Sequence, residues 1–256
     1  MKQLLLIIQL LLVTVFAQAG NKIKVACVGN SVTFGHGITD KEKAYPAVLQ
    51  QQLGVGYDVR NFGHSGTTLL EQGHRPYRQK PEYKDAMAFK ADIVVIHLGL
   101  NDTDPRNWPN YNSRFDRDYQ QLITDFRTAN PNAKIWICLM SPIFDRHPRF
   151  QSGTRDWHEA IQKHIQRIAR ANGTGLIDLH TPLYKRPDLF ADALHPNGEG
   201  AAIIAQTVYA SITGNYGGLR MAPLYGDGMV MQRHQPVVFR GTANAAEKVN
   251  VAFNGQ

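Results

Sequence analysis

Four short segments, far apart in the chain, hold residues that could together carry out acyl transfer from an ester. They are residues 29–33 (GNSVT), 61–63 (NFG), 99–102 (GLND) and 192–195 (DALH). Acyl transfer needs a nucleophile, a base with a partner that orients it, and hydrogen-bond donors for the oxyanion of the tetrahedral intermediate. Each segment alone is a weak signal, but the four in combination supply every one of these groups.

Ser31 is the predicted nucleophile and His195 the predicted base. Ser31 follows an apolar run, and Gly29 permits a tight turn that would present the hydroxyl at the edge of a sheet. Pro196 favours an extended backbone at His195. The carboxylate of Asp192, three residues before the histidine, can then hold Nδ1 and leave Nε2 facing the serine.

These residue types also have ordinary structural uses. A serine after a glycine can cap a helix, and an aspartate three residues before a histidine is usually a solvated loop pair. Because the chain has 10 histidines, His195 is selected by its neighbours alone. The competing histidines are His36, His64, His97 and His180, of which the first two could line the site instead.

Three hydrogen-bond donors are predicted for the oxyanion. Gly63 has no side chain, so its N–H can approach a ligand closely. The side-chain amide of Asn101 and the N–H of Ser31 supply the other two, and each such donor is typically worth about 3 kcal/mol of transition-state stabilisation. Asn101 and Asp102 also suit a turn. We expect Asp102 to be a hydrogen-bond acceptor that fixes a loop rather than a catalytic acid.

Strand and helix signals alternate along the chain, which predicts an α/β fold. Near-continuous apolar strands indicate a sheet covered on both faces, so we expect a doubly wound, mostly parallel five-stranded sheet flanked by helices. The predicted strands are residues 23–28, 57–61, 92–98, 134–140 and 176–179, and the predicted helices are residues 44–53, 115–129, 155–171 and 198–212. Ligands bind at the carboxyl edge of such sheets. Three of the four segments follow the first three strands and the last follows the fifth strand, so all four are expected to meet there.

The two ends of the chain differ from its centre. Residues 1–19 combine a basic start, an apolar run and a final A-x-A pattern, which predicts a cleaved signal peptide and a secreted or periplasmic protein without stable membrane insertion. A buried first helix or a membrane anchor is the alternative. Residues 20–216 are predicted to form the α/β domain. Residues 217–256 alternate like strands and are predicted to begin a second, β-rich domain that is cut short.

Composition excludes several classes of function. The net charge of +7 is dispersed, with no basic run typical of a nucleic-acid surface. No cysteine–histidine spacing suggests zinc, and the predicted chemistry needs no metal or organic cofactor. The only cysteines, Cys27 and Cys138, lie in strand-like runs. Export would permit a disulfide, but two buried thiols are favoured.

The four segments resemble, in order, the conserved blocks of the SGNH (GDSL-type) esterases and lipases. The resemblance covers residues 23 to about 213 and implies a flavodoxin-like three-layer fold. It implies Ser31 as nucleophile, His195 as base and Asp192 as its orienting partner, with Ser31, Gly63 and Asn101 as oxyanion donors. Asn30 stands where the family often has aspartate, a position that is neither nucleophile, base nor donor.

The tail narrows the predicted substrate. Residues 222–233 (APLYGDGMVMQR) and 249–255 (VNVAFNG) resemble the entry to the second domain of bacterial sialate O-acetylesterases. The resemblance implies hydrolysis of O-acetyl esters on carbohydrate, with sialic acid favoured. An esterase acting on xylan or another polysaccharide, a lysophospholipase-like lipase and a non-catalytic carbohydrate-binding module are the alternatives. Candidate contacts to the sugar are Arg75, Arg78, Arg106, Arg114, Tyr77, Trp108 and Tyr111.

Overall fold

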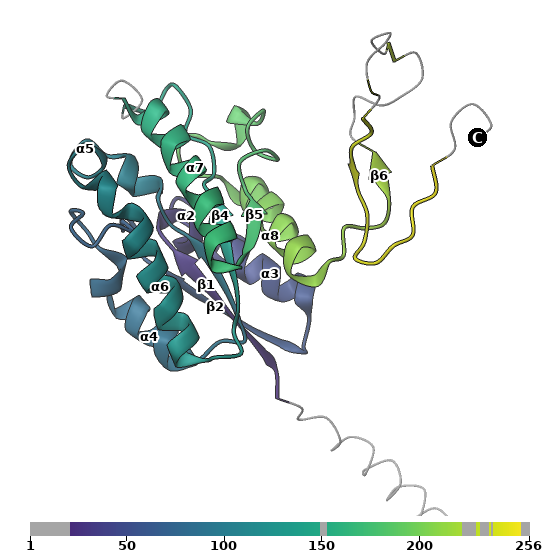
Figure 1. Ribbon diagram of the computed structural model, residues 1–256, viewed down its shortest axis with the longest axis horizontal. Helices are drawn as coiled ribbons and strands as arrows, with labels where there is room; N and C mark the ends of the chain where they lie inside the picture. Colours follow the sequence, from purple (N-terminus) through teal and green to yellow (C-terminus); the bar gives the residue numbers. More distant parts are fainter. Residues whose placement is uncertain (1–20, 149–152, 222–228, 231–235, 237, 252–256) are drawn as a thin grey trace, which may run out of the picture.

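A five-stranded sheet forms the centre of the protein (Figure 1). The computed structural model describes residues 21–148, 153–221, 229–230, 236 and 238–251. The strands are all parallel and lie in the order β2-β1-β3-β4-β5. Their bounds are β1 (Ile23–Gly29), β2 (Tyr57–Gly63), β3 (Ile93–His97), β4 (Lys134–Leu139) and β5 (Gly175–Asp178). The predicted fold class is therefore confirmed.

Burial along the strands explains why they read as continuous apolar runs. Every residue of β3 is buried, and so are the last five residues of β1, because helices cover both faces of the sheet. The edge strand β2 is half-exposed over most of its length and only its last two residues are buried. Cys27 of β1 and Cys138 of β4 are buried free thiols, as expected.

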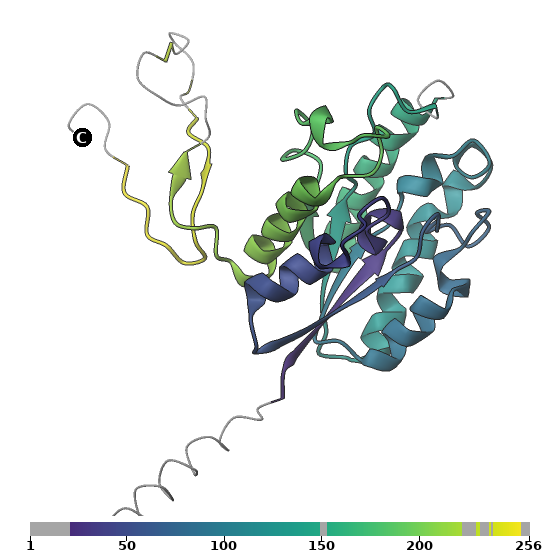
Figure 2. The same cartoon turned by 180° about the vertical axis from the view of Figure 1, so that it is seen from behind.

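Helices form one layer on each face of the sheet. On one face, α3 (Tyr45–Leu53) packs against α8 (Gly198–Thr213), as Figure 2 shows. On the other lie α4 (Pro81–Phe89), α6 (Phe115–Ala129) and α7 (Thr154–Asn172), which are in front in Figure 1. The predicted helices correspond to α3, α6, α7 and α8.

Three α-helices were not predicted from the sequence. They are α4, α2 (Ser31–Phe34) and α5 (Trp108–Tyr111). Only Ala86 and Phe89 of α4 are fully buried, so its sequence carries little of the apolar periodicity that identifies a helix. The other two have four residues each, which is too short for any periodic pattern to develop.

The order of the strands brings the predicted active-site segments together. Strand β1 lies between β2 and β3. The connection after β1 contains α3 on one face of the sheet and the connection after β3 contains α6 on the other, and such a reversal is the usual position of a ligand site in open α/β sheets. Gly29 at the end of β1 is in register with Gly63 of β2 and His97 of β3. The segments that follow these three strands therefore begin side by side.

The C-terminal residues form a separate small ribbon. After α8 ends at Gly214, β6 (Arg220–Met221) pairs antiparallel with β7 (Gly241–Thr242), and both strands are exposed. Much of the predicted β-rich segment, and all of the predicted signal peptide, lie outside the described residues. None of the described helices is both long enough and apolar enough to cross a membrane.

Candidate active site

Ser31, His195 and Asp192 form one continuous hydrogen-bonded chain. The Ser31 hydroxyl oxygen lies 2.8 Å from Nε2 of His195, and Nδ1 of the same ring lies 2.6 Å from Oδ2 of Asp192. Because Nδ1 faces a carboxylate, it carries the ring proton, and Nε2 accepts the hydrogen bond from the serine. Ser31 and His195 are 164 positions apart in the sequence and meet at the carboxyl edge of β1.

The loop that carries the histidine is fixed by the same aspartate. Oδ1 of Asp192 accepts the N–H groups of Leu194 (3.0 Å) and His195 (2.7 Å). Ala193, between Asp192 and Leu194, has a left-handed backbone, with φ of 63°. Its carbonyl accepts the N–H of Phe144 at 2.9 Å. This connection holds the strained alanine in place, since a non-glycine residue in that region costs free energy.

These contacts determine the charge of Asp192. Partial burial raises the pKa of its carboxyl, but the hydrogen bonds from the His195 ring and from the amides of His195 and Leu194 outweigh burial and bring the pKa to about 2. The carboxylate is therefore ionised at neutral pH and favours a proton on Nδ1 of the histidine.

Ser31 is positioned by the start of α2 directly after β1. Asn30 is the N-cap of this short helix, and its Oδ1 accepts the N–H of Val32 at 3.0 Å. Gly29 does not have a positive φ. A Cβ at this position would overlap Thr33 and lie 2.7 Å from the carbonyl oxygen of His97. The glycine is therefore required for close packing rather than for the tight turn predicted from the sequence.

Asn101 and Asp102 lock the loop after β3 to the loop after β2. Nδ2 of Asn101 donates to the carbonyl of Thr67 at 2.9 Å. The buried carboxylate of Asp102 accepts the N–H groups of Leu69 (2.9 Å) and Leu70 (2.8 Å). Burial raises the pKa of Asp102 to about 6, although its backbone hydrogen bonds lower it. The predicted role of Asp102 in fixing a loop is confirmed.

The backbone N–H of Gly63 is already used in a hydrogen bond within β2. The N–H donates to Oδ1 of Asn61 at 2.9 Å. The residue packs so closely on α2 that a Cβ would overlap the backbone of Phe34. Gly63 is therefore needed for packing between β2 and α2, and this geometry does not support its predicted role as an oxyanion donor.

Gly66, in the loop that follows Gly63, has a backbone N–H that is better placed to act as a donor. Gly66 has a left-handed backbone, with φ of 80°, and within the described ranges its N–H has no hydrogen-bond acceptor. It precedes Thr67, whose carbonyl contacts the Asn101 amide. Both Gly63 and Gly66 are visible in the sequence as candidate donors. The sequence does not show that the N–H of Gly63 is already bonded to Asn61.

The other candidate histidines have different positions. The ring of His36 lies 4.4 Å from that of His195, so it lines the site as expected. His64 pairs with Glu82, with Nδ1 2.9 Å from Oε2. His97 is buried, and its Nε2 accepts the N–H of Ser141 at 3.2 Å.

Most of the predicted sugar contacts are structural instead. Tyr77 and Trp108 are almost fully buried. Arg78 pairs with Asp125 and Glu71, and Arg106 with Asp104. Arg75, Arg106 and Arg114 are exposed. Arg75 lies against Gly66, with Nη1 3.3 Å from the carbonyl oxygen of Ser65.

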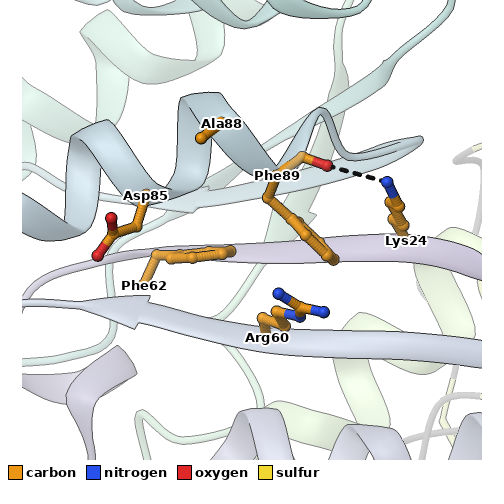
Figure 3. A pocket seen from close by; sticks show the side chains of 6 residues that line it. All are labelled: Lys24, Arg60, Phe62, Asp85, Ala88 and Phe89. Atoms are coloured by element: carbon orange, nitrogen blue, oxygen red, sulfur yellow. Dashed lines mark hydrogen bonds between the residues drawn. The ribbon is translucent and has the colours of Figure 1, made fainter.

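One cavity of about 540 Å³ lies away from the triad, between the edge of the sheet and α4 (Figure 3). Its walls include Lys24, Arg60 and Phe89. Nζ of Lys24 donates to the Phe89 carbonyl at 3.3 Å, and the Arg60 guanidinium lies 4.4 Å from the centre of the Phe89 ring. Both cations are thus used in packing. In the part of the chain that the structure describes, no group of three or more His, Cys, Asp or Glu residues is arranged to hold a metal.

Comparison with known families agrees with this geometry. A model of the GDSL-like lipase/acylhydrolase family matches residues 27–203, which include Ser31, Asp192 and His195. The protein chain belongs to this family. The GDSL-like segment extends from within β1 to within α8 and so contains the whole five-stranded sheet except its first residues.

Similar proteins in this family include carbohydrate esterases. An acetylxylan esterase from Xylanibacter ruminicola is 39% identical over 209 residues, which are 74% of this chain and 43% of that protein. The chain thus spans less than half the length of this relative. A carbohydrate acetylesterase from Sinorhizobium meliloti has a TM-score of 0.60 at 17% identity over 75% of this chain and 98% of that one. An acetyl xylan esterase structure has a TM-score of 0.56 at 20% identity over 74% of this chain and 100% of that one. These two structures show the shared fold.

Proposed function

We propose that this protein is a serine esterase that removes acetyl groups from the hydroxyls of a carbohydrate, with acetylated xylan as the preferred substrate class. The observation that carries the proposal is the chain of hydrogen bonds from Ser31 Oγ through His195 to Asp192, with distances of 2.8 and 2.6 Å. A serine hydroxyl in contact with a neutral imidazole, oriented by a carboxylate, is the arrangement that acyl transfer requires.

The reaction has two stages. Nε2 of His195 takes the hydroxyl proton as Ser31 Oγ attacks the acetyl carbonyl carbon. When the tetrahedral intermediate collapses, the ester C–O bond breaks, and the protonated Nε2 gives its proton to the departing sugar oxygen. A water molecule then attacks the acetyl-serine with His195 as base, and acetate leaves as the Ser31 hydroxyl is restored.

Three N–H groups are proposed to stabilise the oxyanion. The N–H of Ser31 lies at the start of α2, where the helix dipole favours negative charge. The side-chain amide of Asn101, which also donates to the Thr67 carbonyl, is the second donor. The N–H of Gly66 replaces that of Gly63, because the Gly63 N–H is held by Asn61. Each donor is expected to contribute about 3 kcal/mol in the transition state.

Xylan ranks ahead of sialic acid as the proposed substrate. The sequence favoured sialate because of the resemblance in residues 222–233 and 249–255, most of which lie outside the described residues. The 39% identical relative is named an acetylxylan esterase, and the match covers 74% of this chain. Because that protein is much longer than this chain, its specificity is transferred here only as a proposal.

The test is a substrate panel with a serine variant. Purified protein should hydrolyse a small chromogenic acetate ester and release acetate from acetylated xylan fragments faster than from O-acetylated sialic acids. Ser31→Ala should lose nearly all of this activity, because removing the nucleophile of such a triad costs on the order of 10⁶-fold in kcat. Its circular dichroism spectrum and melting temperature should remain near those of the unaltered protein.

The same panel distinguishes the alternatives. Full activity in a folded Ser31→Ala variant would exclude the proposed mechanism. Higher rates with long acyl chains would indicate a lipase, and preference for sialic acid would reverse the ranking of substrates. A protein that binds carbohydrate but turns over none of these esters would be a binding module.

A further inference from the structure

A second depression opens at the same edge of the sheet as the active site. It is a groove of about 660 Å³ between α7 and the segment that follows β5. The last residues of β4 and β5, Leu139 and Asp178, form part of its floor. Since all five strands are parallel, their carboxyl ends face the same side of the molecule, and the groove lies at the same edge of the sheet as Ser31.

A short series of aromatic rings lines one wall of the groove. The rings of His180 and Tyr184 are stacked, with centroids 5.0 Å apart and planes inclined by 28°. The ring of His158 from α7 follows, 5.6 Å from that of His180. Tyr184 is 59% exposed, so its ring is accessible from solvent.

The exposed ring is held in place by its own backbone turn. The N–H of Tyr184 donates to the carbonyl of His180 at 2.9 Å, and the adjacent Leu183 is fully buried. Asp178 accepts the N–H of His180 at 2.9 Å and the hydroxyl of Thr181 at 2.6 Å. The aromatic surface is thus ordered before any ligand binds, which reduces the entropy cost of binding.

Polar side chains from α7 line the groove on the same helix face as His158. Arg155, Glu159, Gln162 and Gln166 recur at spacings of three and four residues, so they lie on one face of the helix, and all four line the groove. The Gln162 amide is bonded to the N–H and the carbonyl of Met140, at 2.8 and 3.1 Å. The guanidinium, carboxylate and amide groups of the other three supply donors and acceptors that sugar hydroxyls need. An aromatic face in the same groove as such groups is suited to a sugar ring, which has apolar C–H faces and a polar rim.

The charges favour a neutral sugar over an acidic one. The groove has two carboxylates, Glu159 and Asp178, and one guanidinium, that of Arg155. Glu159 also pairs with Lys163 at 2.7 Å, and Arg155 lies 3.8 Å from Asp156. Burial lowers the pKa of His158 to about 4, and burial also lowers that of His180, so neither ring adds positive charge at neutral pH. A sialate or uronate carboxylate would therefore find no surplus of positive charge in the groove.

A direct structural connection links the groove to the catalytic loop. Ile143 lines the groove, and the next residue, Phe144, donates its N–H to the carbonyl of Ala193 at 2.9 Å. Ala193 lies between Asp192 and His195 in the loop that carries the base. The segment that lines the groove is thus bonded directly to the loop that carries the base.

From these contacts we infer that the groove binds the uncharged backbone of an acetylated polysaccharide beyond the sugar whose ester is at Ser31, with Tyr184 as the stacking surface. This inference rests on the proposed function for the identity of the substrate, but binding can be measured without turnover. It identifies the substrate class as a neutral polymer or long oligosaccharide rather than a single sugar.

The test compares polymer and small ester in Tyr184→Ala. Its kcat/KM on acetylated xylan should fall by about tenfold, as expected for loss of one stacked ring. Its kcat/KM on a small chromogenic acetate should not change, because that ester does not reach the groove. Tyr184→Phe should keep the polymer activity. Tyr216→Ala, which removes a 38% exposed tyrosine after α8, is the matched control and should behave like the unaltered protein.

A binding measurement separates this inference from the proposed function. Full-length Ser31→Ala should bind unsubstituted xylo-oligosaccharides in calorimetry or affinity electrophoresis, and adding Tyr184→Ala should remove that binding. This result would stand even if the enzyme proved inactive on xylan esters. Equal polymer activity and equal binding with and without Tyr184 would overturn the inference, as would tighter binding to acidic polygalacturonate fragments than to xylo-oligosaccharides.

Discussion

Asp192 illustrates how one carboxylate sets both the geometry and the charge of the base. Oδ2 holds the imidazole ring of His195, while Oδ1 accepts two backbone N–H groups of the same loop. Its pKa of about 2 means that it stays ionised far below neutral pH. Loss of activity on acidification is therefore expected from protonation of the histidine, not of Asp192, because only a neutral Nε2 can accept the serine proton.

Replacing this carboxylate by an amide should uncouple fold from catalysis. In Asp192→Asn one oxygen can still accept the loop amides, but the NH₂ group faces Nδ1 and favours the wrong tautomer of His195. The expected fall in kcat is about 10⁴-fold, the size of effect seen for this substitution in Ser-His-Asp triads. Steady-state kinetics on a small acetate ester measure it. Asp188→Asn, which removes an exposed carboxylate paired with Arg186, is the control and should leave kcat unchanged. Comparable rates in both variants would contradict the role of Asp192.

Residue types and order predicted which side chains meet at the active site, but not how backbone groups are used. Ser31 and His195 are recognisable because their chemistry is rare in combination. Gly63 was misassigned because the sequence does not reveal that its N–H already bonds to Asn61. Tyr184, the proposed stacking surface, was not predicted, since the exposure of an aromatic ring depends on the fold around it.

The loops after β2 and β3 act as one unit because Asp102 joins them. Its buried carboxylate accepts the amides of Leu69 and Leu70, and this contact keeps the 66–67 backbone beside Asn101. Backbone N–H groups buried in this way have no access to water if their acceptor is removed.

Asp102→Asn should therefore loosen this pair of loops. The new NH₂ group would face one of the two N–H donors, leaving a buried group unpaired at a cost of about 1–3 kcal/mol in the free energy of unfolding. Urea denaturation measures this loss, and kcat should fall as well because Asn101 shifts. Asp85→Asn, on the exposed face of α4, should have little effect on stability. Unchanged stability in Asp102→Asn would mean that the loops are held by other contacts.

At the level of elements, hydrophobic periodicity predicted the five strands and the helices α3, α6, α7 and α8. It did not predict the helices α2, α4 and α5. Strands such as β3 are apolar throughout and cannot be mistaken for surface segments. The short helix α2 forms because Asn30 caps it and because Gly29 of β1 and Gly63 of β2 leave room for it to pack directly against the strand ends. Such contacts join residues distant in sequence, and no local pattern encodes them.

At the scale of the whole molecule, the α/β domain and the C-terminal ribbon differ in how much they bury. The sheet and its helices share one continuous core. The described residues of β6 and β7 are exposed, and the ribbon is held by hydrogen bonds such as those from the amides of Tyr216 and Gly218 to Asn244 Oδ1. A two-stranded ribbon has only marginal stability in water without a partner surface.

Limited proteolysis should therefore separate the two parts. We expect a protease to cleave first between residues 217 and 256, because cleavage follows local opening and an exposed ribbon opens at little cost. The α/β domain should persist as a stable fragment that retains kcat on a small acetate ester, since Ser31, Asp192 and His195 all lie within it. Mass spectrometry of the fragments and assay of the digest measure both outcomes. First cleavage within the α/β domain, or loss of activity in step with loss of the tail, would show instead that residues 217–256 help to hold the active site.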